Sequence, residues 1–162
     1  MLFRSGDEAE NAFLKALSLA PNDAETYKRL AAVRFLQGEA NDNPKGDREK
    51  AKVFYTKALD SARQAIRISP ALGEAHLTEG QILIALGRRK EGIEALRHCL
   101  RSRPEQPQAH FVLGKALAAE GQLVEARRHL QDAVRFAVKN DTRAKEALEQ
   151  FEKDHPKDRV GP

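Results

Sequence analysis

A pattern of 34 residues is written twice between Gly73 and Asn140. A shift of 34 positions places Pro70 on Pro104, His76 on His110, Gly80 on Gly114, Leu83 on Leu117, Gly87 on Gly121 and Leu96 on Leu130. A unit of this length rarely buries its apolar face alone, so neighbouring units stack into a solenoid. Because solenoids mostly present surfaces to other molecules, the repeat predicts a binding module.

Each repeat is predicted to contain two helices joined by a tight turn. The first of the two copies has a turn residue at Gly87, followed by a helical stretch that stops before Pro104. Within that stretch Ile93, Leu96 and Leu100 recur at intervals of three and four, which places them on one helix face. Aromatic residues make up 6% and charged residues 32% of the chain, which agrees with an all-α reading.

Three stretches share a further spacing of aromatic, small and apolar positions. They contain Tyr27, Leu30, Ala31, Ala58, Ala62 and Pro70; then His76, Gly80, Leu83, Gly92, Leu96 and Pro104; then His110, Leu113, Gly114, Leu117, Ala126 and Leu130. This spacing resembles the tetratricopeptide repeat family, with its pattern W-x2-L-G-x2-Y, A-x3-F, P. Arg34, Glu79 and Val138 depart from it. The resemblance implies an all-α, right-handed helix-turn-helix solenoid of about eight helices, with His76 and His110 as packing residues.

The period divides the chain into successive units. We expect one domain over 1–154, made of a half repeat at 7–21, repeats at 24–70, 73–106 and 107–140, and a polar capping helix at 141–153. The remaining residues, 155–162, are expected to form a disordered tail. The half repeat lacks its first helix, so we expect Met1 to begin a fragment or to follow removed sequence. A homodimer through this open half repeat is one alternative.

The repeat at 24–70 carries 15 extra residues between 39 and 57. Turn-forming residues after Gly38 and a helical stretch from about Arg48 predict a longer loop and a second helix extended at its N-terminus, with Tyr55 on or near the extension. A tolerated surface insertion explains this length, because loops accept extra residues at small entropic cost. The functional alternative is a lip over one end of a binding groove.

No constellation of residues predicts catalysis, a cofactor or a metal site. Gly114-Lys115 lacks the hydroxyl residue of a phosphate-binding loop, because Ala116 follows. No two histidines lie four apart, as zinc ligands on one helix would require. His129 and Asp132 share a helix face, but no serine or cysteine completes a triad. We therefore expect a protein that is not an enzyme, with Cys99 as an inert buried thiol.

The resemblance implies a concave surface built by the first helix of each repeat. On this chain the corresponding peptide-binding positions are Lys28, Ala32, Phe35, Leu77, Gln81, Ile84, Phe111, Lys115 and Ala118. This wall is largely apolar with polar anchors, and we expect about a third of its first-helix positions to belong to the core instead. The expected occupant is an extended peptide or an amphipathic helix of a partner protein. Only Lys28 fits the lysine, arginine and asparagine clamp with which some family members grip chaperone C-termini.

Two other functions stay open at this point. Basic residues gather on the expected convex side: Arg88, Arg89, Lys90, Arg97, Arg101, Arg103, Arg127 and Arg128. They would suit a polyanion, but interspersed glutamates and missing aromatic platforms disfavour nucleic acid. The chain could also regulate a larger enzyme or recruit its substrates. The net charge of +4 supports solubility rather than a choice of partner, and neither a membrane span nor a signal peptide is predicted, which leaves the compartment open.

Overall fold

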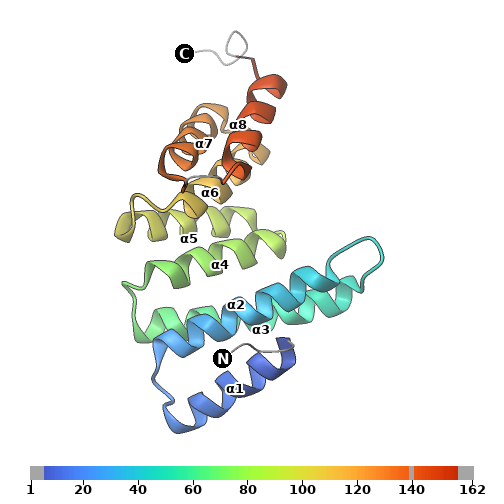
Figure 1. The fold of residues 1–162 in the computed structure, drawn as a ribbon, viewed down its shortest axis with the longest axis vertical. Helices are drawn as coiled ribbons and strands as arrows, with labels where there is room; N and C mark the ends of the chain where they lie inside the picture. The colour runs from blue at the N-terminus through green and yellow to red at the C-terminus, as the bar shows by residue number, and fades with distance from the viewer. Residues whose placement is uncertain (1–5, 139–140, 157–162) are drawn as a thin grey trace. The chain divides into compact units, whose positions relative to one another are not determined.

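The structure is a computed structural model that describes residues 6–138 and 141–156. These residues form eight α-helices and no strand (Figure 1). In chain order the helices are α1 Gly6–Leu19, α2 Ala24–Asn41, α3 Arg48–Ile68, α4 Gly73–Ala85, α5 Arg89–Ser102, α6 Pro107–Ala119, α7 Leu123–Phe136 and α8 Arg143–Asp154. The prediction of an all-α fold with about eight helices is confirmed.

The chain divides into two compact units, Met1–Ala95 and Leu96–Pro162, and the boundary falls inside α5. The expected single domain over 1–154 therefore stays a prediction. No helix in the described part of the chain is both long and apolar enough to cross a membrane.

Local chemistry accounts for where several helices begin and end. The carboxylate of Asp23 accepts a hydrogen bond from the Glu25 amide at 3.1 Å and caps α2, and Asp47 does the same for α3. At the other end of a first helix, Gly87 and Gly121 adopt φ angles of 77° and 76°, which side chains with a Cβ rarely tolerate. The repeat thus places a left-handed glycine after α4 and again after α6.

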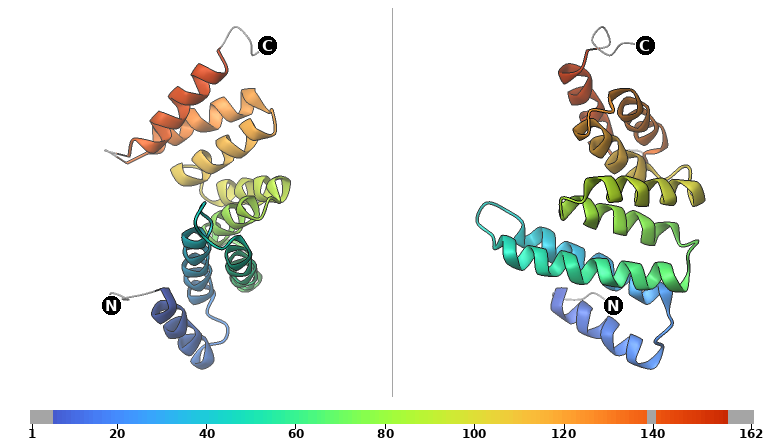
Figure 2. Two further views of the ribbon diagram at one scale, coloured as in Figure 1. Left: turned by 90° about the vertical axis from the view of Figure 1, so that its right-hand side faces the viewer. Right: turned by 180° about the vertical axis from the view of Figure 1, so that it is seen from behind.

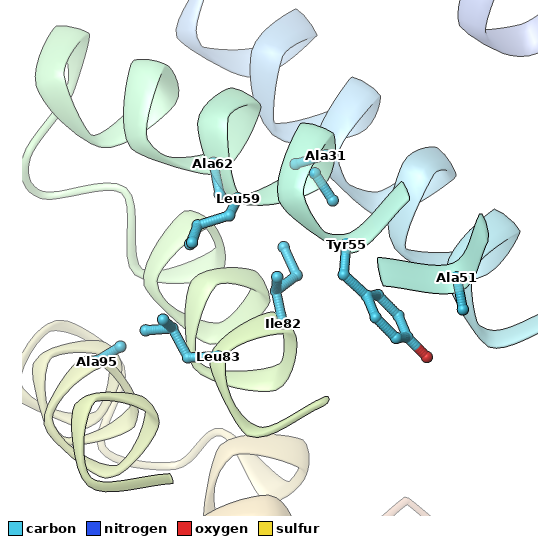
Figure 3. Packing of buried hydrophobic residues seen from close by; sticks show 9 residues of the cluster. Ala31, Ala51, Tyr55, Leu59, Ala62, Ile82, Leu83 and Ala95 are labelled. Atoms are coloured by element: carbon cyan, nitrogen blue, oxygen red, sulfur yellow. The ribbon is translucent and has the colours of Figure 1, made fainter. Parts of the chain in front are cut away.

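The core of the first unit lies where α2, α3 and α4 meet. Ala31, Ala58 and Ala62 are fully buried, so their small side chains let α2 and α3 approach closely. Larger residues from α3 and α4 fill the remaining space, including Leu59 and Ile82 (Figure 3). The small positions of the repeat pattern are therefore the points of helix contact.

The extra residues of the first full repeat lengthen both of its helices and the loop between them. Helix α2 continues through Gly38 to Asn41, the loop covers only 42–47, and α3 begins at Arg48. The hairpin end of α2 and α3 extends past the neighbouring α4 (Figures 1 and 2). The expected start of the second helix near Arg48 is confirmed, and the loop at 42–47 is longer than the breaks at 86–88 and 120–122, as predicted. The extension of α2 through Gly38 was not predicted.

Packing explains why a glycine stands at position 38. A Cβ on Gly38 would overlap the ring of Tyr55, which is buried at 4% exposure. The phenolic hydroxyl of Tyr55 donates to Asp42 Oδ2 at 3.3 Å, near the end of the hairpin. Gly38 thus gives the tyrosine room inside the hairpin, and the helix does not stop at it.

The repeated histidines tie each repeat to the loop before it. His76 Nε2 lies 2.9 Å from the carbonyl oxygen of Pro70, and His110 Nε2 lies 2.7 Å from that of Pro104. Because a carbonyl only accepts hydrogen bonds, each Nε2 carries the hydrogen.

In the second unit α7 packs between α6 and α8. Gly114 of α6 lies against Leu130, so that a Cβ at position 114 would come within 2.8 Å of Leu130 Cγ. On the other side, the Arg127 guanidinium stacks 5.5 Å from the Phe151 ring and donates to the His155 carbonyl at 2.7 Å. The expected free tail therefore does not begin at His155, and residues 157–162 of that tail lie outside the described residues.

Candidate functional site

In the first unit, two of the predicted contact residues belong to the helix packing. Leu77 is 8% exposed and offers little surface, so its burial disfavours a place in the groove, which stays a prediction. Ile84 is half-buried, and its Cγ1 would meet a Cβ placed on Gly92 at 2.7 Å, which puts it against α5. Both are apolar residues on the first helix of a repeat. An apolar residue at such a position can pack against the next helix or face the groove, and the sequence pattern does not distinguish the two.

Two more predicted contacts of the first unit are engaged by neighbours. Lys28 Nζ lies 2.8 Å from Glu25 Oε1 and 2.5 Å from Glu74 Oε2. Burial alone would lower the pKa of Lys28, but hydrogen bonds to these two carboxylates raise it overall. Phe35 packs on Tyr55 with ring centroids 5.7 Å apart. Of the remaining positions, Ala32 is exposed and Gln81 is half-buried.

The extended hairpin of the first unit forms one wall of a hollow of about 340 Å³. Asp42, Arg48, Glu49 and Lys52 line it from the hairpin, and Ala85 and Leu86 line it from the end of α4. None of the predicted groove residues lines this hollow. The inserted residues therefore shape a surface of their own, which the sequence indicated only as a lip.

The second unit brings predicted contact residues to a hollow between α6 and α8. This α6–α8 hollow has a volume of about 300 Å³. Its lining comprises Lys115, Ala118, Leu130, Ala147, Gln150, Phe151, Asp154 and His155. Lys115 and Ala118 were predicted as contacts, whereas the α8 residues were missed. The apolar face of the capping helix was the signal that could have found them.

Phe111 lies beside the α6–α8 hollow without lining it. The Lys115 ammonium stands 5.4 Å from the centroid of the Phe111 ring, which is a cation–π distance. Phe111 itself lines a smaller hollow of about 120 Å³ with Gln108, Asp141 and Arg143. The three predicted contact residues of α6, which are Phe111, Lys115 and Ala118, therefore all line solvent-accessible hollows.

Carboxylates neutralise part of the basic surface. Arg88 pairs with Glu91 at 2.7 Å in the first unit, and Arg97 pairs with Glu125 at 3.1 Å in the second. A polyanion would have to displace these partners. The distribution of ion pairs therefore weakens the nucleic-acid alternative.

A buried pair of histidines joins α6 to α7. His110 and His129 are 6% exposed, and their Nδ1 atoms lie 2.8 Å apart. Burial lowers the pKa of His129, and the charges of His110 and Arg128 lower it further, against the opposing effect of Glu125 and Asp132. The fold therefore favours the neutral ring of His129.

This preference predicts that acid destabilises the second unit. The pKa of His129 is lower in the folded chain than the unfolded value of about 6.5. The contribution of neutral His129 to the free energy of unfolding is therefore fully present above about pH 6.5 and is lost as the pH falls below this value. We expect the melting temperature, measured with a chelator present, to fall by several degrees between pH 7 and pH 5. His129→Gln should flatten this dependence, and His98→Gln, at an exposed site, should not.

Comparisons with known proteins agree with the fold. Residues 77–141 match the family model described as tetratricopeptide repeat. DnaJ homolog subfamily C member 7 of Mus musculus is 28% identical over 81 residues, which are 50% of this chain and 13% of that protein. The chain thus spans a small part of this curated relative.

Two solved structures have a similar all-α fold. A thermophilic tetratricopeptide repeat protein of Thermus thermophilus aligns with a TM-score of 0.76 and 20% identity, covering 90% of this chain and 72% of the other. A mutant O-GlcNAc transferase of Thermobaculum terrenum aligns with a TM-score of 0.65 and 25% identity, covering 80% of this chain and 22% of the other. Helix pairs of this kind form protein-interaction scaffolds. The family model over residues 77–141, the repeat pattern and the shared fold together support a tetratricopeptide repeat family for this chain.

Proposed function

We propose that this chain binds a short peptide segment of a partner protein in the α6–α8 hollow. The observation that carries the proposal is the meeting of predicted contacts on α6 with an apolar patch on α8. Ala118 and Ala147 are half-buried there, and the Phe151 ring shares the lining with them. An apolar peptide side chain placed on this patch would be removed from water, which favours binding.

Polar groups at the rim would orient the bound peptide. The Gln150 amide donates to Asp154 Oδ1 at 2.9 Å, which leaves the Gln150 carbonyl oxygen to accept from a peptide N–H. Lys115 is exposed and can donate to a peptide carbonyl or carboxylate. A hollow of this size with few polar anchors suits affinities in the micromolar range, which corresponds to about 8 kcal/mol.

A charge placed in the hollow should prevent capture. Peptides selected from a displayed random library on the full chain should bind it in solution, and Ala118→Glu should weaken them at least thirtyfold, about 2 kcal/mol, because the glutamate must lose water in an apolar site. Isothermal titration calorimetry measures the effect. Ala119→Glu, at an exposed position of the same helix, is the matched control.

Melting curves of both variants establish that they fold. Lys115→Glu provides a second probe at an exposed site, and we expect it to shift selection away from acidic peptides. If selected peptides bind Ala118→Glu as tightly as the unchanged chain, the α6–α8 hollow is not their site. A library that yields no binder at all would also contradict the proposal.

A further inference from the structure

The histidine pair of the second unit has an arrangement that packing alone does not require. His110 Nε2 lies 2.7 Å from the Pro104 carbonyl oxygen, so Nε2 carries the hydrogen and Nδ1 of the neutral ring carries the lone pair. That lone pair points at His129 Nδ1, 2.8 Å away. A backbone carbonyl that holds the far nitrogen of a histidine is the usual support of a metal-ligating ring.

His129 has a matching arrangement on its own far side. Its Nε2 lies 3.6 Å from Glu125 Oε1, and Glu125 pairs with Arg97 at 3.1 Å. A carboxylate accepts hydrogen bonds only, so Glu125 is placed to stabilise a hydrogen on Nε2 when Nδ1 binds an ion. In the ion-free pair, His129 Nδ1–H donates to the His110 lone pair, and an ion between the two nitrogens would take the place of that hydrogen.

A carboxylate completes the group. Asp132 Oδ2 lies 4.0 Å from His110 Nδ1, and one ligand atom from each of His110, His129 and Asp132 lies within 4.8 Å of the others. Two neutral imidazoles and one carboxylate match the ligand preferences of zinc. The aspartate side chain is 29% exposed, which gives an ion a path from solvent.

From this geometry we propose that His110 Nδ1, His129 Nδ1 and an Asp132 carboxylate oxygen bind one Zn²⁺ ion. Zinc–nitrogen bonds of about 2.0–2.1 Å at tetrahedral angles separate two ligand nitrogens by roughly 3.3 Å. The rings would therefore move apart by about half an ångström from their present 2.8 Å separation. Three protein ligands leave the fourth position to water, and the ion would fasten α6 to α7.

Zinc titration of the chelator-treated full chain tests the proposal. Calorimetry should show about one Zn²⁺ per chain with a dissociation constant in the micromolar range or tighter, which corresponds to about 8 kcal/mol or more. His110→Gln, His129→Gln and Asp132→Asn should each weaken binding at least tenfold. His98→Gln and His155→Gln, which change histidines elsewhere in the second unit, should bind zinc unchanged.

Two further measurements keep the test decisive where a histidine variant unfolds. Asp132→Asn removes a partly exposed ligand without emptying the core. Co²⁺ added to the unchanged chain should give the visible absorption of a tetrahedral nitrogen and oxygen site, and Zn²⁺ should abolish it. Unchanged zinc affinity in Asp132→Asn, or a Co²⁺ spectrum of the hexa-aquo ion, would overturn the proposal and leave a proton shared by the two rings.

Discussion

Replacement of Tyr55 by alanine is expected to lower the free energy of unfolding of the first unit by about 3–5 kcal/mol, as for other buried aromatic residues. Tyr55 is 4% exposed and packs against Phe35 and the bare backbone of Gly38. Neither α2 nor α3 can close over the vacated space without breaking the contacts of Ala31 and Ala58. The cavity should therefore persist, and the cost should lie near the upper end of this range.

The conservative change Tyr55→Phe separates the ring from its hydroxyl. It keeps the packing and removes only the 3.3 Å hydrogen bond to Asp42, so the expected loss is about 1 kcal/mol or less. Urea unfolding followed by far-UV circular dichroism measures both variants. Equal losses in the two variants would show that the hydrogen bond, and not the ring, holds the hairpin together.

The second large effect is expected from Gly114→Val in α6. A Cβ at position 114 would lie 2.8 Å from Leu130 Cγ and 3.1 Å from the Leu130 backbone nitrogen. Valine has the better helix propensity by a few tenths of a kcal/mol. Overpacking against a backbone atom costs about 1–3 kcal/mol or more and outweighs that gain. We therefore expect a net destabilisation of about 1–3 kcal/mol.

The matched control for Gly114→Val is Ala119→Val, at an exposed position of the same helix. This change costs only the difference in helix propensity, about 0.6 kcal/mol. Thermal and urea unfolding of both variants give the comparison. The predicted close approach of α6 and α7 would be wrong if Gly114→Val were as stable as Ala119→Val.

Much of the fold was predictable because equivalent positions of a repeat carry the same residue types and play the same structural role. Gly87 and Gly121 share a position in the period, and both adopt the left-handed φ that ends a helix. Gly38 occupies a corresponding place before an insertion, and there the same residue type serves the Tyr55 ring inside α2. The sequence alone does not tell whether a glycine forms a turn or allows a close helix contact, because both roles require the absence of a Cβ.

The candidate site was less predictable than the fold. Periodicity places Leu77 and Ala118 on first helices alike, yet Leu77 is buried and Ala118 lines the α6–α8 hollow. Which apolar residues remain accessible depends on how neighbouring helices cover them. The pairing of His110 with His129 was also missed, because a search for ligands spaced along one helix does not find two rings on different helices.

The amino-acid sequence by itself determined the helical class, the 34-residue period and the small residues at which helices meet, since these follow from spacing along the chain. Only the tertiary structure decided that the insertion also lengthens α2, that Lys28 is held by two glutamates, and that two buried histidines lie close to Asp132. The physical reason is that exposure, charge and ligand geometry depend on side chains from different helices. Their distances are set by packing and not by position in the chain.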